Sequence, residues 1–187
     1  MIALLVGFLV LGGSVGERSN LETVELYRAA LNNHDIETAM SFLAEEYKLR
    51  FVGTEFVMSK ADLPAMLGWD SGVNGHVDWD VAKGEAETLT FEGRERNDFF
   101  ELLGVAHLQF RTTFRFDGKG KIIEQLYEIC PDQPSWEEAI KPAIEWASRH
   151  RPVELKEIHP EGQMIYTEEA ARRWVTLLRE WRSMKSE

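Results

Sequence analysis

Residues 105–129, VAHLQFRTTFRFDGKGKIIEQLYEI, decide the fold of this chain. Apolar and polar residues alternate through the first half, which is the pattern of a strand with one buried face. The apolar face holds Leu108, Phe110 and Phe114, and the polar face holds His107, Gln109 and Arg111. Residues 117–120, Asp-Gly-Lys-Gly, form a turn with glycine where positive φ is tolerated. Residues 121–129 then return as the partner strand, so the stretch predicts an antiparallel hairpin.

The same period of two begins upstream, at His76. Val77, Trp79 and Val81 alternate with Asp78 and Asp80. A turn centred on Gly84 leads into a second strand, which carries Leu89, Phe91 and then residues 94–98. Together with the hairpin, these strands predict an antiparallel meander.

Apolar residues at helical spacing lie before the meander in the chain. Residues 20–31 and 36–43 carry apolar stripes, and the polar joint 32–35 ends the first helix and caps the second. Residues 47–52 are predicted to form a strand, and Ser59 with Asp62 opens a third helix as a capping box. Helices followed by a meander indicate an α+β fold with the helices on one sheet face.

Residues 131–187 are interpreted as a helical extension packed on a core of residues 17–130, not as an independent domain. Ser135 with Glu138 is a capping box, and Pro142 predicts a kink or early break in the helix that follows. Thr167 caps the last helix. Its apolar stripe consists of Ala171, Trp174, Leu178 and Trp181.

Residues 1–16 differ from the rest of the chain. They contain an almost purely apolar run followed by the small residues Gly12–Gly16, which is typical of a secretory signal peptide. We therefore expect an exported protein that has no stable membrane insertion after cleavage. A retained N-terminal anchor and a cytoplasmic protein are the alternatives.

Charge and composition exclude several classes of partner. The formal net charge is -11, and no cluster of Lys and Arg stands out, which argues against nucleic-acid binding. Cys130 is the only cysteine, so an internal disulfide is excluded. The five histidines show no metal-binding spacing, and no phosphate-binding glycine motif is present. We expect neither a metal nor a cofactor.

Three stretches carry a resemblance to a known family: LYRAALNNHDIETAMSFLAEEYKLRF at 26–51, ERNDFF at 95–100 and DGKGKIIEQLYEI at 117–129. In this order they resemble the nuclear-transport-factor-2-like (NTF2-like) superfamily, in particular its SnoaL-like branch, over residues 20–130. The resemblance implies a cone-shaped, strongly curved antiparallel sheet wrapped around helices, with an internal pocket. That fold hosts cyclases, isomerases, dehydratases, epoxide hydrolases and non-catalytic binding proteins, so it implies no single function.

Arg96 and Asp98 are the candidate catalytic residues. On a strand they share one face, and limonene-epoxide-hydrolase-like members of the superfamily use an Arg-x-Asp at this place. The other catalytic groups of those enzymes have no counterpart here. Their second acid aligns with Tyr127, and the Tyr and Asn that position their catalytic water align with Leu49 and Phe51. Epoxide hydrolysis is therefore disfavoured. The alternative for the pair is a structural salt bridge within the sheet.

Two functions follow from the sequence. The first is a binding protein whose pocket, with Tyr127, Trp79 and Trp69 as candidate walls, holds a small and largely apolar molecule. The second is a cofactor-independent cyclase, isomerase or dehydratase that uses Arg96 and Asp98 as acid–base groups. A cavity of about 300 Å³ or more that exposes Asp98 would support either, whereas a filled cone would remove both and leave an interaction or structural role. Relatives of this fold often dimerise through the outer sheet face, so a homodimer is also expected; a solvated face is the alternative.

Overall fold

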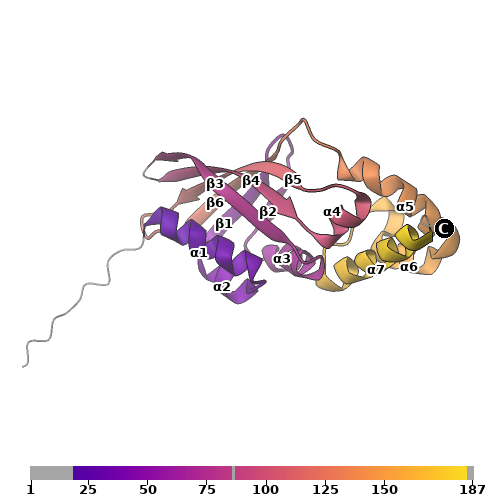
Figure 1. Cartoon of the computed structure of the whole chain (residues 1–187). Coiled ribbons are helices and arrows are strands. Elements are labelled where there is room, and N and C mark those ends of the chain that lie inside the picture. Colours follow the sequence, from indigo (N-terminus) through magenta and orange to yellow (C-terminus); the bar gives the residue numbers. More distant parts are fainter. Residues whose placement is uncertain (1–18, 86, 185–187) are drawn as a thin grey trace, which may run out of the picture.

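The computed structural model describes residues 19–85 and 87–184 (Figure 1). The predicted signal peptide at 1–16 lies outside the described residues. The strands are β1 (Leu43–Phe51), β2 (Val57–Ser59), β3 (His76–Glu85), β4 (Thr88–Arg96), β5 (Leu108–Phe116) and β6 (Ile122–Ile129). The helices are α1 (Asn20–Asn32), α2 (Ile36–Ser41), α3 (Leu63–Gly72), α4 (Asp98–Leu103), α5 (Trp136–His150), α6 (Pro152–Ile158) and α7 (Glu168–Met184), with a 3₁₀ turn η1 (Pro160–Gly162).

The six strands form one sheet in the order β2-β1-β6-β5-β4-β3. Neighbours are antiparallel, as the meander predicted, except that β1 and β6 run parallel. The parallel pair was not expected, because it joins strands from opposite ends of the core that no local pattern connects. The β5–β6 hairpin is confirmed, and Asp117 accepts hydrogen bonds from the N–H groups of Lys119 and Lys121 in its turn. Gly84 does not form a turn, since it pairs with Leu89 inside the β3–β4 ladder.

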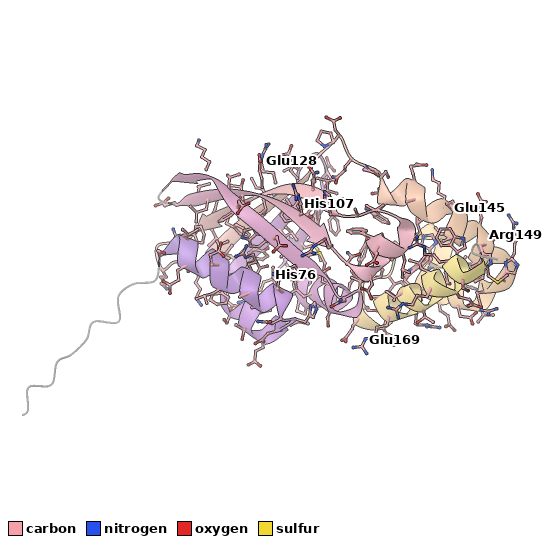
Figure 2. The ribbon with its side chains drawn as sticks, in the orientation of Figure 1. His76, His107, Glu128, Glu145, Arg149 and Glu169 are labelled. Atoms are coloured by element: carbon pink, nitrogen blue, oxygen red, sulfur yellow. The ribbon has the colours of Figure 1, made fainter. Side chains whose placement is uncertain are left out.

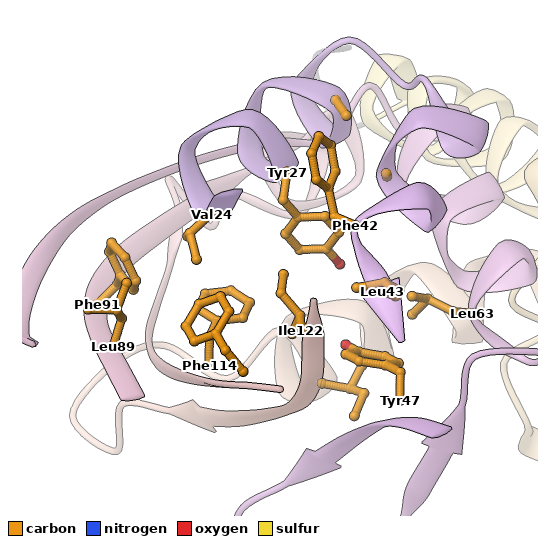
Figure 3. Packing of buried hydrophobic residues seen from close by; sticks show 14 of the residues in the cluster. Val24, Tyr27, Phe42, Leu43, Tyr47, Leu63, Leu89, Phe91, Phe114 and Ile122 are labelled. Carbon is orange, nitrogen blue, oxygen red and sulfur yellow. The ribbon is translucent and has the colours of Figure 1, made fainter. Parts of the chain in front are cut away.

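Helices α1, α2 and α3 cover one face of the sheet (Figure 1). Val24 and Tyr27 of α1 point at the sheet, toward Ile122 and Phe114 (Figure 3). The Tyr27 and Phe114 rings meet edge to face, with centroids 6.0 Å apart. The predicted faces of β5 are confirmed, since Leu108, Phe110 and Phe114 are buried and Gln109 and Arg111 are exposed. The core of the cone therefore forms from the period-3.6 and period-2 stripes that the sequence shows.

Helix α1 also covers the free edge of β3. Asn32 bonds both backbone groups of Val77, at 2.8 Å each, and Arg28 donates to the carbonyl of Trp79 at 3.2 Å. An exposed edge strand offers unpaired backbone groups to other chains. These three bonds cover that edge and fix α1 against the sheet near Val77.

A second cluster of buried apolar residues joins the C-terminal helices to the core. Trp174 and Leu178 of α7 lie in it together with Trp69 of α3 and Phe99 of α4. Helices α3 and α7 approach closely, because a Cβ on Gly72 would lie 2.6 Å from the Cβ of Ala171. The extension thus shares its apolar contacts with α3 and α4.

The predicted early break at Pro142 is wrong, because α5 runs from Trp136 to His150 with this proline inside it. Proline removes one backbone hydrogen bond of a helix. Ile140, Ala143 and Ala147 are buried around it, and their packing offsets that loss. Two predicted caps are confirmed: Ser135 accepts from the N–H of Glu138, and Thr167 from that of Ala170. The predicted capping box of Ser59 and Asp62 is wrong, because Ser59 ends β2 and α3 begins at Leu63 without a side-chain cap.

Candidate functional site

The side chains of β4 alternate between the interior of the cone and the outer face of the sheet. Phe91 is fully buried, so Glu95, four positions later, also faces inward. Its partner across the β3–β4 ladder is Val77, one of the apolar residues packed against the core. Arg94 and Arg96 have the opposite parity and are exposed. The polar side chain that β4 sends into the cone is therefore Glu95.

The expectation that Arg96 and Asp98 pair on one strand face is wrong. Strand β4 ends at Arg96, and Asn97 caps α4 by accepting from the N–H of Phe100 at 2.7 Å, so Asp98 is the first residue of that helix. Arg96 instead bonds the carboxylate of Asp78, at 3.1 Å. The carboxylate of Asp98 bonds Arg179 of α7 at 3.0 Å. A capping asparagine directly after the strand is the local reason for the change of direction.

Glu95 is half-buried, and both of its carboxylate oxygens have donors. The amide of Asn97 donates to Oε1 at 3.0 Å, and the Tyr127 hydroxyl donates to Oε2 at 3.4 Å. Tyr127 is held in place because its ring stacks on Phe110, with centroids 4.9 Å apart. Tyr127, a predicted pocket wall, therefore contacts the acid of the site with its polar end.

Asp70 of α3 faces Glu95 without comparable support. Among the described residues none donates a hydrogen bond to its carboxyl group; the N–H of Gly75 bonds only its backbone carbonyl, at 2.7 Å. Burial, and then the charge of Glu95, raise the pKa of Asp70 well above its ordinary value. Burial also raises the pKa of Glu95, but the bonds from Asn97 and Tyr127 oppose that rise. Because a carboxylate is stabilised by donors, Glu95 carries the negative charge more readily than Asp70 does.

A cavity of about 40 Å³ lies where this pair, α1, α2 and β3 meet. Most of its wall is apolar. The lining residues are Ala30, Leu31, Asn32, His34, Asp35, Ile36, Ala39, Leu67, Asp70, Gly75, His76, Val77 and Glu95. The α1–α2 joint forms part of its lining, and His34 in this joint has a φ of 55°. His76 opens β3 close to α3 (Figure 2).

The cavity differs from the one expected. It is well below the expected size of about 300 Å³, and Asp98 does not line it. A hollow of about 300 Å³ does exist, but at the other end of the sheet, between the start of α1 and the turn of residues 117–121. The carboxyl pair of Asp70 and Glu95 therefore lines the smaller cavity, inside the cone, whereas the larger hollow is lined by Asp117 together with Lys119 and Lys121.

Two candidate pocket residues lie in different clusters. Trp79 is buried in the cone among Phe91, Phe110 and Phe114, and its indole N–H has no partner among the described residues. Trp69 belongs to the second cluster, where its ring contacts Phe99 and Tyr166. Neither tryptophan lines the cavity.

A chain of buried polar side chains runs across the sheet from Tyr47. Its hydroxyl donates to Gln125 at 2.9 Å, and Gln125 donates to the Thr112 hydroxyl at 3.1 Å. Tyr27, on the helical side, has its pKa raised by burial and then by the charge of Asp70. These groups were missed in the sequence because each stands singly within an apolar stripe.

Residues 19–85 and 87–184 include the five histidines and the cysteine of the chain. No group of three or more His, Cys, Asp or Glu side chains there could hold a metal ion. His107 and Glu128 lie away from α1–α3 (Figure 2). None of the described helices has the length and apolar character needed to cross a membrane.

No protein-family model matches the sequence, and no curated protein matches it closely enough to count as a relative. Solved structures are similar in fold. An epoxide hydrolase/cyclase-like enzyme with a role in pyran ring formation in the polyether salinomycin aligns at 13% identity, over 61% of this chain and 92% of its own, with a TM-score of 0.53.

Two further structures align over similar lengths. A protein from Shewanella putrefaciens CN-32 described as a candidate SnoaL-like polyketide cyclase is 17% identical over 69% of this chain and 92% of its own, with a TM-score of 0.50. A protein of unknown function with a cystatin-like fold, from Methylobium petroleophilum PM1, is 15% identical over 65% of this chain and 82% of its own, with a TM-score of 0.51. Identities this low show a shared fold and leave the chemistry of this chain to its own residues.

Proposed function

From an NTF2-like, SnoaL-like fold whose cavity contains a carboxyl pair, we propose that this protein binds a small, largely apolar molecule between α1–α3 and the sheet. One observation carries the proposal. Asp70 and Glu95 are only half-buried, so they reach the space of an otherwise apolar cavity, and Asp70 has no hydrogen-bonding partner among the described residues. An unpartnered carboxyl group is costly in such surroundings, and a ligand would relieve that cost.

The size of the cavity limits the ligand. About 40 Å³ accommodates a group of a few atoms, so a larger molecule requires the wall to move. The α1–α2 joint is the wall segment suited to move, because it is short and contains His34 in a left-handed conformation. A ligand that separates α2 from α3 would have access to both acids.

A second candidate function is acid–base catalysis without a cofactor, as in a cyclase, isomerase or dehydratase. The specific observation in its favour is that the two acids differ: Asp70 has no donors, whereas Glu95 has two. A protonated acid beside an ionised base can give one proton and take another in the same step. This pair replaces Arg96 and Asp98 as our candidate acid–base groups.

Epoxide hydrolysis stays disfavoured for this chain. Leu49 and Phe51 still occupy the positions where the related enzymes place water-binding groups, and the final strand has Tyr127 in place of an acid. Leu49 is buried in the core and offers no polar atom. A water held for attack on an epoxide would need such groups.

The test is a search for a molecule retained by the full-length chain. Native mass spectrometry of the purified protein should show an adduct that denaturation releases. Glu95→Gln and Asp70→Asn should lose the adduct, while Asp98→Asn, which changes an acid outside the cavity, should keep it. An adduct retained by all three variants would place the binding site elsewhere.

A further inference from the structure

We infer that the ligand of this cavity carries an ammonium group, which Asp70 and Glu95 hold while its hydrocarbon part lies against the apolar wall. The inference rests on the proposed function, because it names the class of ligand for the same site. It is carried by the contacts and charges around the two acids.

The carboxyl pair has no cation among the residues that the structure describes. Within residues 19–85 and 87–184, neither Asp70 nor Glu95 has a salt-bridge partner, and no lysine or arginine lines the cavity. Glu124 makes the contrast clear: its side chain is only 18% exposed, and it bonds both Arg50 and Arg115. Partly buried acids are normally paired in this way, so the missing cation has to come from outside the chain.

The free acceptors match an ammonium group. Its three N–H donors need oxygen acceptors, and the carboxyl of Asp70 offers two without competing donors. Glu95 is already held by Asn97 and Tyr127, which leave its remaining lone pairs available and keep it in position beside Asp70. A neutral hydroxyl would satisfy one acceptor and leave the negative charge of the pair unopposed.

The rest of the wall fits a short alkyl or cycloalkyl group. Leu31, Ile36, Leu67 and Val77 face the cavity without polar side-chain atoms. About 40 Å³ holds an ammonium group and few carbons before the joint must open. The net charge of -11 adds a field that draws cations toward the protein.

Binding of a cation should displace the proton that the pair retains. The other titratable groups near the pair are Tyr27 of α1, Tyr127 of β6, and His34, Asp35 and His76 in the cavity lining. Burial first, and then the charges of the acids, raise the pKa of both tyrosines, so they stay neutral. Because the cation displaces a proton, affinity for an amine should rise with pH until the amine itself loses its charge.

The experiment is isothermal titration of the full-length chain with n-butylammonium and with 1-butanol, which has a similar shape and no charge. Titrations in two buffers of different ionisation enthalpy report proton release. We expect the ammonium to bind about tenfold more tightly than the alcohol, as charged hydrogen bonds do, and to release protons. Asp70→Asn and Glu95→Gln should remove this preference, and Asp80→Asn, an exposed acid on β3, should retain it.

The remaining outcomes bear differently on the ammonium inference and on the proposed binding of an apolar molecule. Equal binding of alcohol and ammonium, unchanged in Asp70→Asn, would overturn the ammonium inference and leave binding of an apolar molecule intact. Preference for the ammonium that survives both variants would assign it to the acidic surface and also overturn the inference. Binding of neither probe, together with no adduct in the purified protein, would overturn both.

Discussion

At the scale of single residues, Glu95 and Arg96 show how one position changes the role of a side chain. Glu95 reaches the cavity, where Asn97 and Tyr127 bond it. Arg96 lies on the outer face with its side chain 60% exposed and pairs with Asp78. The parity of a strand decides which of the two meets the interior, and the buried Phe91 sets that parity here.

The raised pKa of Asp70 predicts a specific pH dependence of stability. The folded state keeps a proton that the unfolded state loses above the ordinary pKa of 3.8, so the free energy of unfolding falls as pH rises from there through the raised pKa. Asp70→Asn has no such proton to lose. We therefore expect the variant to gain stability relative to the wild type between pH 4 and pH 8, as measured by urea unfolding across that range.

The control for this prediction is Asp80→Asn, which replaces an exposed acid on the neighbouring strand. Groups whose pKa is lowered, such as Asp35 and Asp62, act in the opposite direction in every variant, so only the difference from the wild type is informative. A difference between Asp70→Asn and the wild type that stays constant with pH would show that Asp70 ionises normally in the folded protein.

Asp98→Asn tests the acid–base role that the sequence suggested for Asp98. Its side chain is 32% exposed, and it pairs with Arg179, whose side chain is 63% exposed. Pairs of this kind contribute less than about 1 kcal/mol, so thermal unfolding should change little. Ligand binding should match the wild type, whereas Glu95→Gln should abolish it. Lost binding in a folded Asp98→Asn would restore Asp98 to the site.

At the scale of elements, helix α3 links the site to the extension. One of its faces carries Asp70 into the cavity, and Gly72, half a turn later, lies against α7. The docking of α7 thus supports the helix that positions the unpartnered acid. Strand β2, which the sequence did not indicate, pairs through its residues 57–59 with residues 48–50 of β1.

Gly72→Ala should weaken the contact between α3 and α7. A Cβ there would lie 2.6 Å from both the Cβ of Ala171 and the backbone carbonyl oxygen of Glu168, so the helices would have to separate. Overpacking of this kind costs about 1–3 kcal/mol. Thermal unfolding measures the effect, and Gly118→Ala is the matched control, because a Cβ at Gly118 meets no atom within 4 Å. Equal melting temperatures for the two variants would contradict the close approach.

At the scale of the whole molecule, charged groups on the outer sheet face pair with one another. Arg111 bonds Glu92 at 2.8 Å and lies 3.5 Å from Glu128, while Glu124 bonds Arg50 and Arg115. These pairs are mutually satisfied, so this face can stay solvated or meet a second copy. The interior differs, because Asp70 and Glu95 have no cationic partner in the part of the chain that the structure describes.

The expected homodimer through this face gives a prediction of its own. Arg111→Glu would place a third acid between Glu92 and Glu128 in each copy and repel the same patch of the partner. We expect the variant to sediment as a monomer while keeping its circular dichroism spectrum. Lys119→Glu, in the turn at the sheet end, is the control and should sediment like the wild type. A wild type that is already monomeric would refute the dimer.

The amino-acid sequence by itself determined the elements and their faces. Helix caps at Ser135 and Thr167, the hairpin at 117–120 and the buried face of β5 all follow from local patterns. The likeness of residues 20–130 to NTF2-like proteins followed from the same elements in order. Local chemistry suffices for these features because each depends on residues close together in the chain.

Only the tertiary structure decided the site. Counting from Phe91 would have placed Glu95 inside, but nothing in the sequence indicates that Asp70, on a helix before the meander, lies beside it. Likewise, Arg96 and Asp98 do not pair with each other: Arg96 pairs with Asp78 of β3, and Asp98 pairs with Arg179 of α7. The parallel pairing of β1 with β6 is also a contact between segments far apart in the chain. Contacts between distant segments depend on how the whole chain buries its apolar faces, and that packing alone leaves two carboxyl groups together without a cation.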